Sequence, residues 1–590
     1  MSLLQQLSTL ENANLIRLAA TQPELEYLFR HALMQETVYH SFVRADRRLV
    51  HRLVGECLEQ LHAGRTDLPE LAPQLARHFD EANEPARALP YYTLAADAAM
   101  ARYALNEAIA LLSRALACAQ KVTAGADTWQ HLYTARGRAL ELNAQHDQAL
   151  ANYQAMGEQA RERGDRPTAL AALILEGQLY STPTPLFNPA RAECLAETAL
   201  LEARALGDRP AEAKVLWTQL NSYRFTRRMR LALASGERSL AIARELGLSE
   251  QLALTLNDMV HVYAQTGQWP AGKAAAAEVG GLWRRLGNLP MLADSLATSA
   301  LYGTFFGEID ASLGRAAEAH QLSVTIGNLW GQAYSLSNMA WGYWYRGDPG
   351  RALEADEEAI RLSGLAGYGW PRIMNRTQQA FVYRELGDAR TGLALAREAL
   401  DWAEHSMPQG RTIAAAALAL AEVTELGPAA GAARLETIPP DVHNALLWEI
   451  DPVMRTRTAL ALAEGNMPRA LQAAEEHVAL LRSFGLRLFL PEALLSQARC
   501  LLRLGRPAEA GQSLAQARAE AQALGARMAE WQVLLAQGDM AAAAGRPAEA
   551  QQLWADARDI VTAIAQRVPA PELRRSFLLR AEGSRQKSEE

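Results

Sequence analysis

Glycine residues recur along this chain at a fixed spacing of 40 residues. A first series consists of Gly267, Gly307, Gly347, Gly387 and Gly427, and it continues after one 38-residue step as Gly465, Gly505 and Gly545. A second series consists of Gly207, Gly247, Gly287, Gly327 and Gly367, and it resumes at Gly485 and Gly525. Two interleaved series with one period predict two turns, and therefore two helices, in each repeat.

The segments between the glycines have the pattern of amphipathic helices. Ala340 and Tyr343 precede Gly347, Ala352 and Ala359 follow it, and the same frame returns in later repeats. Small residues at these positions allow two helices to cross closely, and each glycine is expected to end a helix in the left-handed conformation. Ala and Leu, both strong helix formers, dominate the composition, while Val, Ile and Thr are sparse. The sequence predicts an all-α solenoid of about a dozen helical hairpins.

Proline positions support the same frame. The hexapeptide Gly-Arg-Pro-Ala-Glu-Ala begins at Gly505 and again at Gly545, which places Pro507 and Pro547 in the first turn of a helix. Proline is tolerated there because the missing N–H would have no partner within the helix.

The spacing of small, aromatic and glycine positions resembles the tetratricopeptide family, over roughly residues 67 to 565. The 40-residue period is longer than the standard repeat. It is similar to the long repeats of maltose-regulon activators, LuxR-type regulators and bacterial cyclase-associated ATPases. Degenerate copies extend N-terminally around Arg227, Asn188 and Asp147. The resemblance implies an α–α superhelix that binds other molecules, and such solenoids serve many partners.

The first hundred residues follow a different pattern. Leu15–Leu18 and Glu26–Phe29 are short alternating segments on either side of a Gln-Pro turn, which predicts a small hairpin, and a helix carrying Arg47, His51 and Arg52 follows. This string resembles the end of the winged-helix region, and the first repeats, of signal-transduction ATPases with numerous domains (STAND ATPases). We therefore expect a winged-helix remnant and connecting helix over residues 1–64, a repeat solenoid over 65–568, and a capping helix with a disordered tail over 569–590.

The sequence contains no complete motif for catalysis, metal binding or nucleotide binding. Gly267–Lys273 has both glycines and the lysine of a phosphate-binding loop, but Ala274 follows where Ser or Thr is required, and Gly267 already belongs to the repeat series. There is no HExxH, GxSxG or zinc spacing. We interpret Cys57, Cys118, Cys194 and Cys500 as small buried hydrophobic residues in a reducing compartment. The expectation is a protein that is not an enzyme, with no catalytic residue, no cofactor and no metal.

One cluster of aromatic residues favours a binding groove. Trp341, Tyr343, Trp344 and Tyr345 lie together on one predicted helix, where the repeat frame assigns Tyr343 to the core and both tryptophans to the concave face. Equivalent positions in other repeats complete a predicted partner-binding groove: Trp217, Asn221, Arg224, Asn257, His261, Trp341, Trp344, Phe381 and Arg384. Aromatic residues and Arg dominate binding hot spots. The alternative interpretation is that these rings pack between repeats.

Charge and hydropathy narrow the choice of partners. The net charge is −7 and the pI about 6.0, without the basic stripe of a nucleic-acid-binding domain. No run of 18 apolar residues occurs, so we expect no membrane association and a cytoplasmic location. Three hypotheses remain open. The first is a scaffold or sensor that binds a protein or peptide. The second is a regulatory fragment of a STAND ATPase whose ATPase and cyclase, kinase or DNA-binding output are on another chain. The third is a small-molecule sensor.

Overall fold

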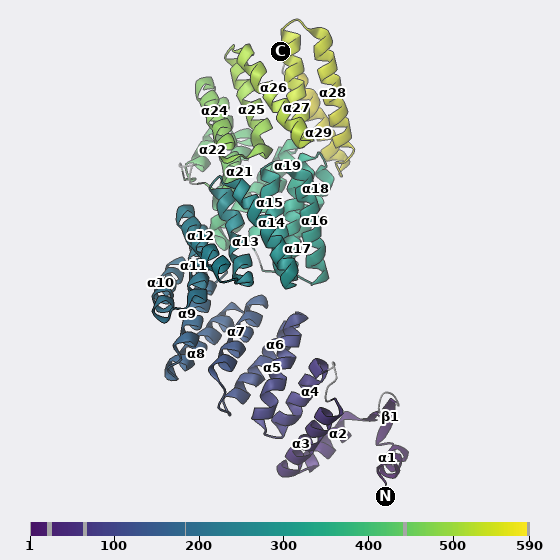
Figure 1. Ribbon diagram of the computed structural model, residues 1–590. Helices are drawn as coiled ribbons and strands as arrows, with labels where there is room; N and C mark the ends of the chain where they lie inside the picture. The colour runs from purple at the N-terminus through teal and green to yellow at the C-terminus, as the bar shows by residue number, and fades with distance from the viewer. Residues whose placement is uncertain are drawn as a thin grey trace. The chain divides into compact units, whose positions relative to one another are not determined.

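The computed structural model describes residues 2–20, 26–62, 68–182, 184–367, 369–439 and 445–586. These residues form α-helices that pack as successive antiparallel pairs, and one two-stranded hairpin (Figure 1). The predicted all-α solenoid class is therefore confirmed. The chain divides into two compact units, residues 1–207 and 208–590, with the division inside the range predicted as one solenoid.

Unit 1 begins with the hairpin and continues as helical pairs. Its elements are α1 (Leu3–Asn12), β1 (Ile16–Ala20), β2 (Glu26–Phe29), α2 (Ala32–Ser41), α3 (Arg44–Leu61), α4 (Leu68–Glu81), α5 (Pro85–Ala101), α6 (Leu105–Ala119), α7 (Ala126–Leu142), α8 (His146–Glu162), α9 (Arg166–Ser181) and α10 (Pro189–Leu206). The two strands pair antiparallel, with Ile16 opposite Phe29. The unit's core runs from α4 to α9 and includes Leu75, Phe79, Leu132 and Tyr153.

Unit 2 contains the regular repeats. Its elements are α11 (Arg209–Phe225), α12 (Met229–Glu245), α13 (Ser249–Gln265), α14 (Trp269–Leu286), α15 (Leu289–Phe305), α16 (Ile309–Thr325), α17 (Leu329–Tyr345), α18 (Pro349–Leu365), α19 (Gly369–Glu385), α20 (Ala389–Ser406), the 3₁₀ turn η1 (Pro408–Gly410), α21 (Arg411–Glu425), α22 (Pro428–Leu435), α23 (Leu447–Ala463), α24 (Met467–Phe484), the 3₁₀ turn η3 (Arg487–Phe489), α25 (Leu490–Arg503), α26 (Pro507–Leu524), α27 (Arg527–Ala543), α28 (Pro547–Ala565) and α29 (Pro571–Gln586).

The helix ends follow from the residues found there. The repeat glycines of unit 2 have left-handed backbone, with φ between 59° and 98°, as their spacing predicted. Many helices start at an Asp or Asn whose side chain accepts the N–H three residues later, as in Asp208, Asn288, Asn328, Asp348, Asp388 and Asn466. Each hairpin is therefore defined locally by its own caps.

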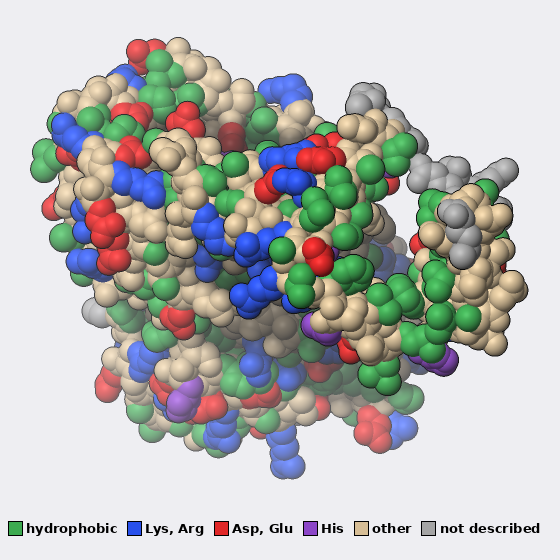
Figure 2. All heavy atoms as spheres, turned by 90° about the horizontal axis from the view of Figure 1, so that it is seen from below, with side chains coloured by type: hydrophobic (Ala, Val, Ile, Leu, Met, Phe, Trp, Pro, Cys, Tyr) green, Lys and Arg blue, Asp and Glu red, His purple; other side chains and the backbone are tan. Residues whose placement is uncertain are grey.

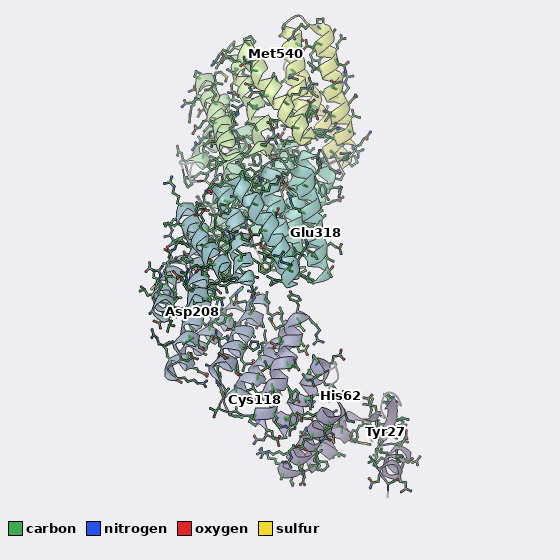
Figure 3. All side chains as sticks on the ribbon, in the orientation of Figure 1. Tyr27, His62, Cys118, Asp208, Glu318 and Met540 are labelled. Carbon is green, nitrogen blue, oxygen red and sulfur yellow. The ribbon has the colours of Figure 1, made fainter. Side chains whose placement is uncertain are left out.

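Charged residues on the outer face form ion pairs between repeats. Arg244 on α12 pairs with Glu278 on α14 at 2.8 Å, and Arg284 on α14 pairs with Glu318 on α16 at 2.7 Å (Glu318 is labelled in Figure 3). Because these side chains are largely exposed, each pair contributes at most about 1 kcal/mol to stability.

Unit 2 winds until its later repeats pack on its earlier ones. Arg227 bonds Glu449 through both terminal nitrogens at 2.8 Å, and the Gln265 side chain accepts the N–H of Leu447 at 3.1 Å. The sequence separation in such contacts ranges from 179 residues for Arg346 to Gly525 up to 222 for Arg227 to Glu449. One superhelical turn therefore takes about five 40-residue repeats. A simple solenoid, in which each repeat touches only its neighbours, would lack these contacts.

Candidate functional site

Three of the predicted groove residues converge on one carboxylate. Trp217, Asn221 and Arg224 lie on one face of α11, and each donates a hydrogen bond to Asp258 on α13, at 2.7, 3.0 and 3.1 Å respectively. Arg224 also donates to the Asn221 side-chain oxygen at 3.1 Å. The side chains of Arg224 and Asp258 are mostly buried. Asp258 was missed by the sequence analysis, because nothing in a single repeat signals that three residues of the preceding repeat need an acceptor.

Asn257 and His261, also on α13, face the next repeat. The Asn257 amide donates to Asp294 on α15 at 2.7 Å, and His261 Nδ1 lies 3.0 Å from the Tyr302 hydroxyl. Burial raises the pKa of Asp294 to about 6, although the Asn257 hydrogen bond opposes the shift. Burial lowers the pKa of His261 well below its ordinary value. The first five predicted residues thus belong to two neighbouring sets of polar contacts, one between α11 and α13 and one between α13 and α15.

Trp341 is half-buried and packed by a later part of the superhelix. Its ring is stacked with that of Tyr345 and meets Phe305 on α15 edge-on, with ring centroids 6.3 and 6.2 Å away. Phe489 of η3 contacts Trp341, Phe305 and Tyr345 together. The neighbouring turn of the superhelix therefore covers the face on which the repeat frame placed Trp341.

The predicted position of Trp344 on the accessible concave face is wrong. Trp344 is only 1% exposed, and its ring packs edge-on against Phe381 on α19, with centroids 5.7 Å apart. Tyr343, assigned to the core from the sequence, is the more exposed of the two. Its ring carries the Arg351 guanidinium 3.9 Å from the centroid, and its hydroxyl accepts a hydrogen bond from Arg351 at 2.6 Å. The physical reason is that the two side chains leave α17 in different directions. Tyr343 points toward the paired helix α18, and Trp344 points toward α19.

Phe381 and Arg384, the last two predicted residues, belong to a charged cluster inside unit 2. Arg384 donates to the neighbouring Glu385 at 2.7 Å, and Arg580 on α29 reaches the same carboxylate at 2.9 Å. Arg455 on α23 lies over the Phe381 ring, 5.1 Å from its centroid. Residues far apart in the chain are therefore brought together at Glu385.

The same cluster extends from α19 to α25. Arg455 donates to Asp451 at 3.0 Å and to Glu492 on α25. Burial acts to raise the pKa of Glu385, but the guanidiniums of Arg580, Arg384 and Arg455 outweigh it and hold that pKa at about 2. Glu385 is thus firmly ionised. Only Phe381 and Arg384 of this set were predicted from the sequence. The adjacent Glu385 was missed, because its distant partners Arg455, Glu492 and Arg580 lie about 70 to 200 residues further along the chain.

Two cavities adjoin the cluster. An inner cavity of about 170 Å³ is lined by Arg384, Glu385, Leu420, Arg455, Thr458, Ala459, Leu462, Glu492, Leu495, Ser496, Arg499, Gln532 and Arg580. An outer cavity of about 550 Å³ is lined by Arg384, Glu385, Gly387, Ala389, Thr424, Ser576, Leu579 and Arg580. The two share Arg384, Glu385 and Arg580, so the ion pairs at Glu385 form the wall between them.

The N-terminal piece of unit 1 exposes many apolar side chains. Within residues 2–20 and 26–62, only Ile16 and Gly55 are fully buried. The exposed apolar residues are Leu3, Leu4, Leu10, Leu18, Leu28, Phe29, Leu33, Val38, Phe42, Val43, Leu49, Val50, Leu53, Val54 and Leu61. A surface of this kind is typical of a protein-interaction site.

The remaining sequence candidates are the segment that resembles a phosphate-binding loop and the four cysteines. Lys273 of the Gly267–Lys273 sequence pairs with Glu308 at 2.7 Å, and its glycine forms the turn between two helices. Cys118 and Cys500 are buried as predicted, but Cys57 and Cys194 are exposed, which corrects the interpretation of all four as buried residues (Cys118 is labelled in Figure 3). Within the described ranges, no group of His, Cys, Asp and Glu is arranged to hold a metal ion, and no helix is long and apolar enough to span a bilayer.

Charged side chains of both signs are interspersed over the surface shown in Figure 2, with one gathering of Lys and Arg near the centre of that view. Hydrophobic side chains are also visible, mainly toward one side. No broad field of a single sign covers this face.

Comparison with known proteins gives only distant likenesses. No protein-family model matches the sequence, and no curated protein is significantly similar to it. A Rap protein solved with competence and sporulation factor is 13% identical over 68% of this chain and 98% of its own, with a TM-score of 0.37. The Cut9–Hcn1 hetero-tetramer of APC/C is 14% identical over 93% of this chain and 96% of its own, with a TM-score of 0.45.

A STAND protein with a tetratricopeptide-repeat sensor from Pyrococcus horikoshii is 14% identical over 69% of this chain and 60% of its own, with a TM-score of 0.34. At this level of similarity, none of these structures indicates what the present chain binds.

Proposed function

We propose that this chain is a non-catalytic binding scaffold, and that the interior of the unit 2 superhelix receives a segment of a protein or a peptide. The observation that carries the proposal is the pair of adjoining cavities at Glu385, lined by side chains from α19, α21, α23, α25, α27 and α29. Concave sites with a few convergent charged groups on an apolar wall are the usual form of a ligand site.

The two sets of polar contacts around Asp258 and Asp294 are part of the same proposal. They lie on α11, α13 and α15, the helices whose residues were predicted to line the groove. Their side chains are already bonded to one another, so we assign them the role of shaping the inner face and assign direct contact to the residues around the two cavities.

Site-specific photo-crosslinking tests this function. Leu579 lines the outer cavity and is 60% exposed, whereas Leu365, at the end of α18, is 64% exposed and lines neither cavity. A photo-reactive residue at position 579 should yield a discrete crosslinked partner in source cells, and the same residue at position 365 should not. Equal products from both positions, or none from 579, would contradict binding in the interior.

The second candidate function is a regulatory fragment that works with a separate STAND-type ATPase. The exposed apolar face of residues 3–61 favours it, since fifteen large apolar side chains there lack a cover within the described part of the chain. In this function unit 2 senses a ligand and the N-terminal piece contacts the ATPase. Replacing Leu33 and Leu53 with Glu should then abolish co-purification of a nucleotide-binding protein and leave crosslinking at position 579 unchanged.

A further inference from the structure

Arg499 is set apart from the other arginines of the inner cavity. It projects from α25 into the space that Arg384, Arg455 and Arg580 also line. Those three each have a carboxylate partner: Glu385 for Arg384 and Arg580, and Asp451 with Glu492 for Arg455. Within the described residues, Arg499 has neither a hydrogen bond nor an ion pair.

The position of Arg499 is both interior and accessible. Its side chain is exposed, yet protein surrounds it closely enough that burial lowers its pKa. Glu385 and Asp539 partly oppose this effect, and Arg580 and Arg503 reinforce it. Both observations are explained by a guanidinium that lines an internal space open to solvent. A guanidinium in such a place is only partly hydrated, so a bound anion would stabilise it strongly.

The side chains that line the inner cavity carry a net positive charge. Four guanidiniums and two carboxylates, Glu385 and Glu492, line the inner cavity, which leaves an excess of two positive charges. Asp451 lies behind Arg455 and reduces the excess to one. All three carboxylates are engaged by arginines other than Arg499. Asp539 on α27 and Arg503 on α25 also act on Arg499, with opposite signs, so an excess of one positive charge remains, and Arg499 is the lining arginine without an ion pair in the described part of the chain.

The size of the cavity limits what can bind there. Its volume of about 170 Å³ is below the 300–1,000 Å³ typical of sites for drug-sized ligands. It is several times the roughly 30 Å³ that one water molecule occupies in the liquid. A single oxyanion with a few waters matches this space, and the apolar wall of Leu420, Ala459, Leu462 and Leu495 can contact a short carbon chain attached to it.

We propose that the inner cavity of unit 2 binds a phosphate group, and that Arg499 is its principal ligand. The planar guanidinium offers two parallel N–H donors that match two oxygens of a phosphate, while Arg384, Arg455 and Arg580 supply the surrounding positive field. The group is either free phosphate or the phosphate of an organic ligand. This inference rests on the proposed function, since it assigns a chemical class to what the interior receives.

The test uses the full chain and inorganic phosphate as the probe. Calorimetric titration and thermal melts, at constant ionic strength and with chloride as reference, should show saturable binding to the wild type. Arg499→Gln should weaken the affinity at least about tenfold, since a charge-assisted bidentate contact is lost. Arg503→Gln is the matched control, because Arg503 lies one turn further along α25, is exposed and lines neither cavity. It adds to the positive field at Arg499 without lining the cavity, so this variant should weaken binding much less than Arg499→Gln does.

A second measurement shows that the Arg499 variant is folded. In the absence of phosphate, Arg499→Gln should melt at the wild-type temperature or above it, because an unpaired, partly desolvated charge has been removed. Glycerol phosphate in place of phosphate identifies the source: tighter binding indicates an organic phosphate, and equal binding indicates the free ion.

Three results would overturn the proposal: no saturable binding to the wild type, equal weakening by Arg503→Gln, or equally strong binding of acetate. Failure here leaves the crosslinking test at position 579 unaffected, and failure of that test leaves phosphate binding to be measured separately.

Discussion

Arg227 occupies a position where most repeats of unit 2 carry glycine. Its φ is 62°, a left-handed conformation that costs a non-glycine residue about 1 kcal/mol or more. In return its guanidinium binds Glu449, which is 0% exposed, through two hydrogen bonds. Arg227→Gly would relieve the strain but leave that buried carboxylate with only its N-terminal backbone partner, Leu446.

Breaking a buried ion pair costs about 3–5 kcal/mol. Because Arg227 is partly exposed, the cost for this pair lies at the lower end of that range or below it. We therefore expect Arg227→Gly to reduce the free energy of unfolding by about 1–2 kcal/mol, as measured by urea denaturation. Glu449→Gln in both backgrounds completes a double-mutant cycle. A variant at least as stable as the wild type would show that the pair does not tie the two turns together.

Trp344 and Tyr343 allow a direct comparison of neighbouring residues. Trp344→Ala should lower the free energy of unfolding by about 3–5 kcal/mol, the usual cost of truncating a buried Trp. Tyr343→Ala should cost less, about 1–2 kcal/mol, since its ring is only half-buried against the core and it also loses the cation–π contact and the hydrogen bond with Arg351. Thermal melts of the two variants decide the matter. A larger loss of stability for Tyr343→Ala than for Trp344→Ala would support the repeat frame, which assigned Tyr343 to the core and Trp344 to the concave face.

His477 on α24 should make unit 2 sensitive to mild acid. Burial lowers its pKa to about 4, although Asp451, 3.5 Å away, opposes the shift, and Arg455 reinforces it. The unfolded chain takes up a proton near pH 6.5, but the folded chain does so only near pH 4. Stability is therefore lost as pH falls from 6.5 to 4, by up to about 3 kcal/mol. Asp294, with its raised pKa of about 6, acts in the opposite direction over part of this range.

His477→Gln should flatten the dependence of unfolding free energy on pH between 4 and 6.5. His405→Gln is the control, because His405 is exposed and the Asp401 carbonyl raises its pKa instead. Denaturation by urea across this pH range gives the slopes. A slope unchanged by His477→Gln would assign the acid sensitivity to other groups, such as His261.

At the scale of the element, close approach between turns requires glycine at particular places. A Cβ on Gly350 in α18 would lie 2.5 Å from the backbone carbonyl oxygen of Arg567, which follows α28. Gly364 in the same helix has open space around it. Gly350→Ala should destabilise the protein by about 1–3 kcal/mol, and Gly364→Ala should be neutral or stabilise it by up to about 1 kcal/mol. Calorimetry of both variants checks this, and equal effects would exclude a specific contact at Gly350.

The helices themselves could be predicted from sequence because their ends are encoded locally. The glycine series gave the left-handed caps, and Pro507 and Pro547 are the first residues of α26 and α28, as their motif indicated. The two-stranded hairpin was also evident from the alternation around Gln22 and Pro23. Each of these signals lies within a few residues of the feature it specifies.

The inner face could be predicted only in part, because its environment depends on distant residues. The frame placed its candidate residues on α11, α13, α17 and α19. It could not show that Phe489 covers Trp341, or that Arg580 completes the cluster at Glu385, since those contacts arise from superhelical winding. The small rotation between repeats accumulates over about five hairpins, and no local pattern reports its size.

At the scale of the whole molecule, winding makes unit 2 more cooperative than a simple solenoid. Ile564 lies close to Gly347, Ser576 lies close to Gly387, and Arg580 donates to the backbone oxygen of Arg384 at 2.6 Å. The last repeats therefore pack on the turns after α17 and α19, which precede them by roughly five repeats. If the stability of each repeat depended only on adjacent repeats, the last repeats would have no effect on the turns after α17 and α19.

Ending the chain at Gly525 separates the two cases. Removing residues 526–590 should leave the remaining chain helical but should increase amide hydrogen exchange in α17 and α19, because their inner turns lose the cover of α27–α29. Helices α4–α9 of unit 1, which have their own core, serve as the internal reference and should exchange as in the intact chain. Exchange that rises only in α25 and α26, next to the cut, would mean that the contacts between turns contribute little and that unit 2 behaves as an ordinary solenoid.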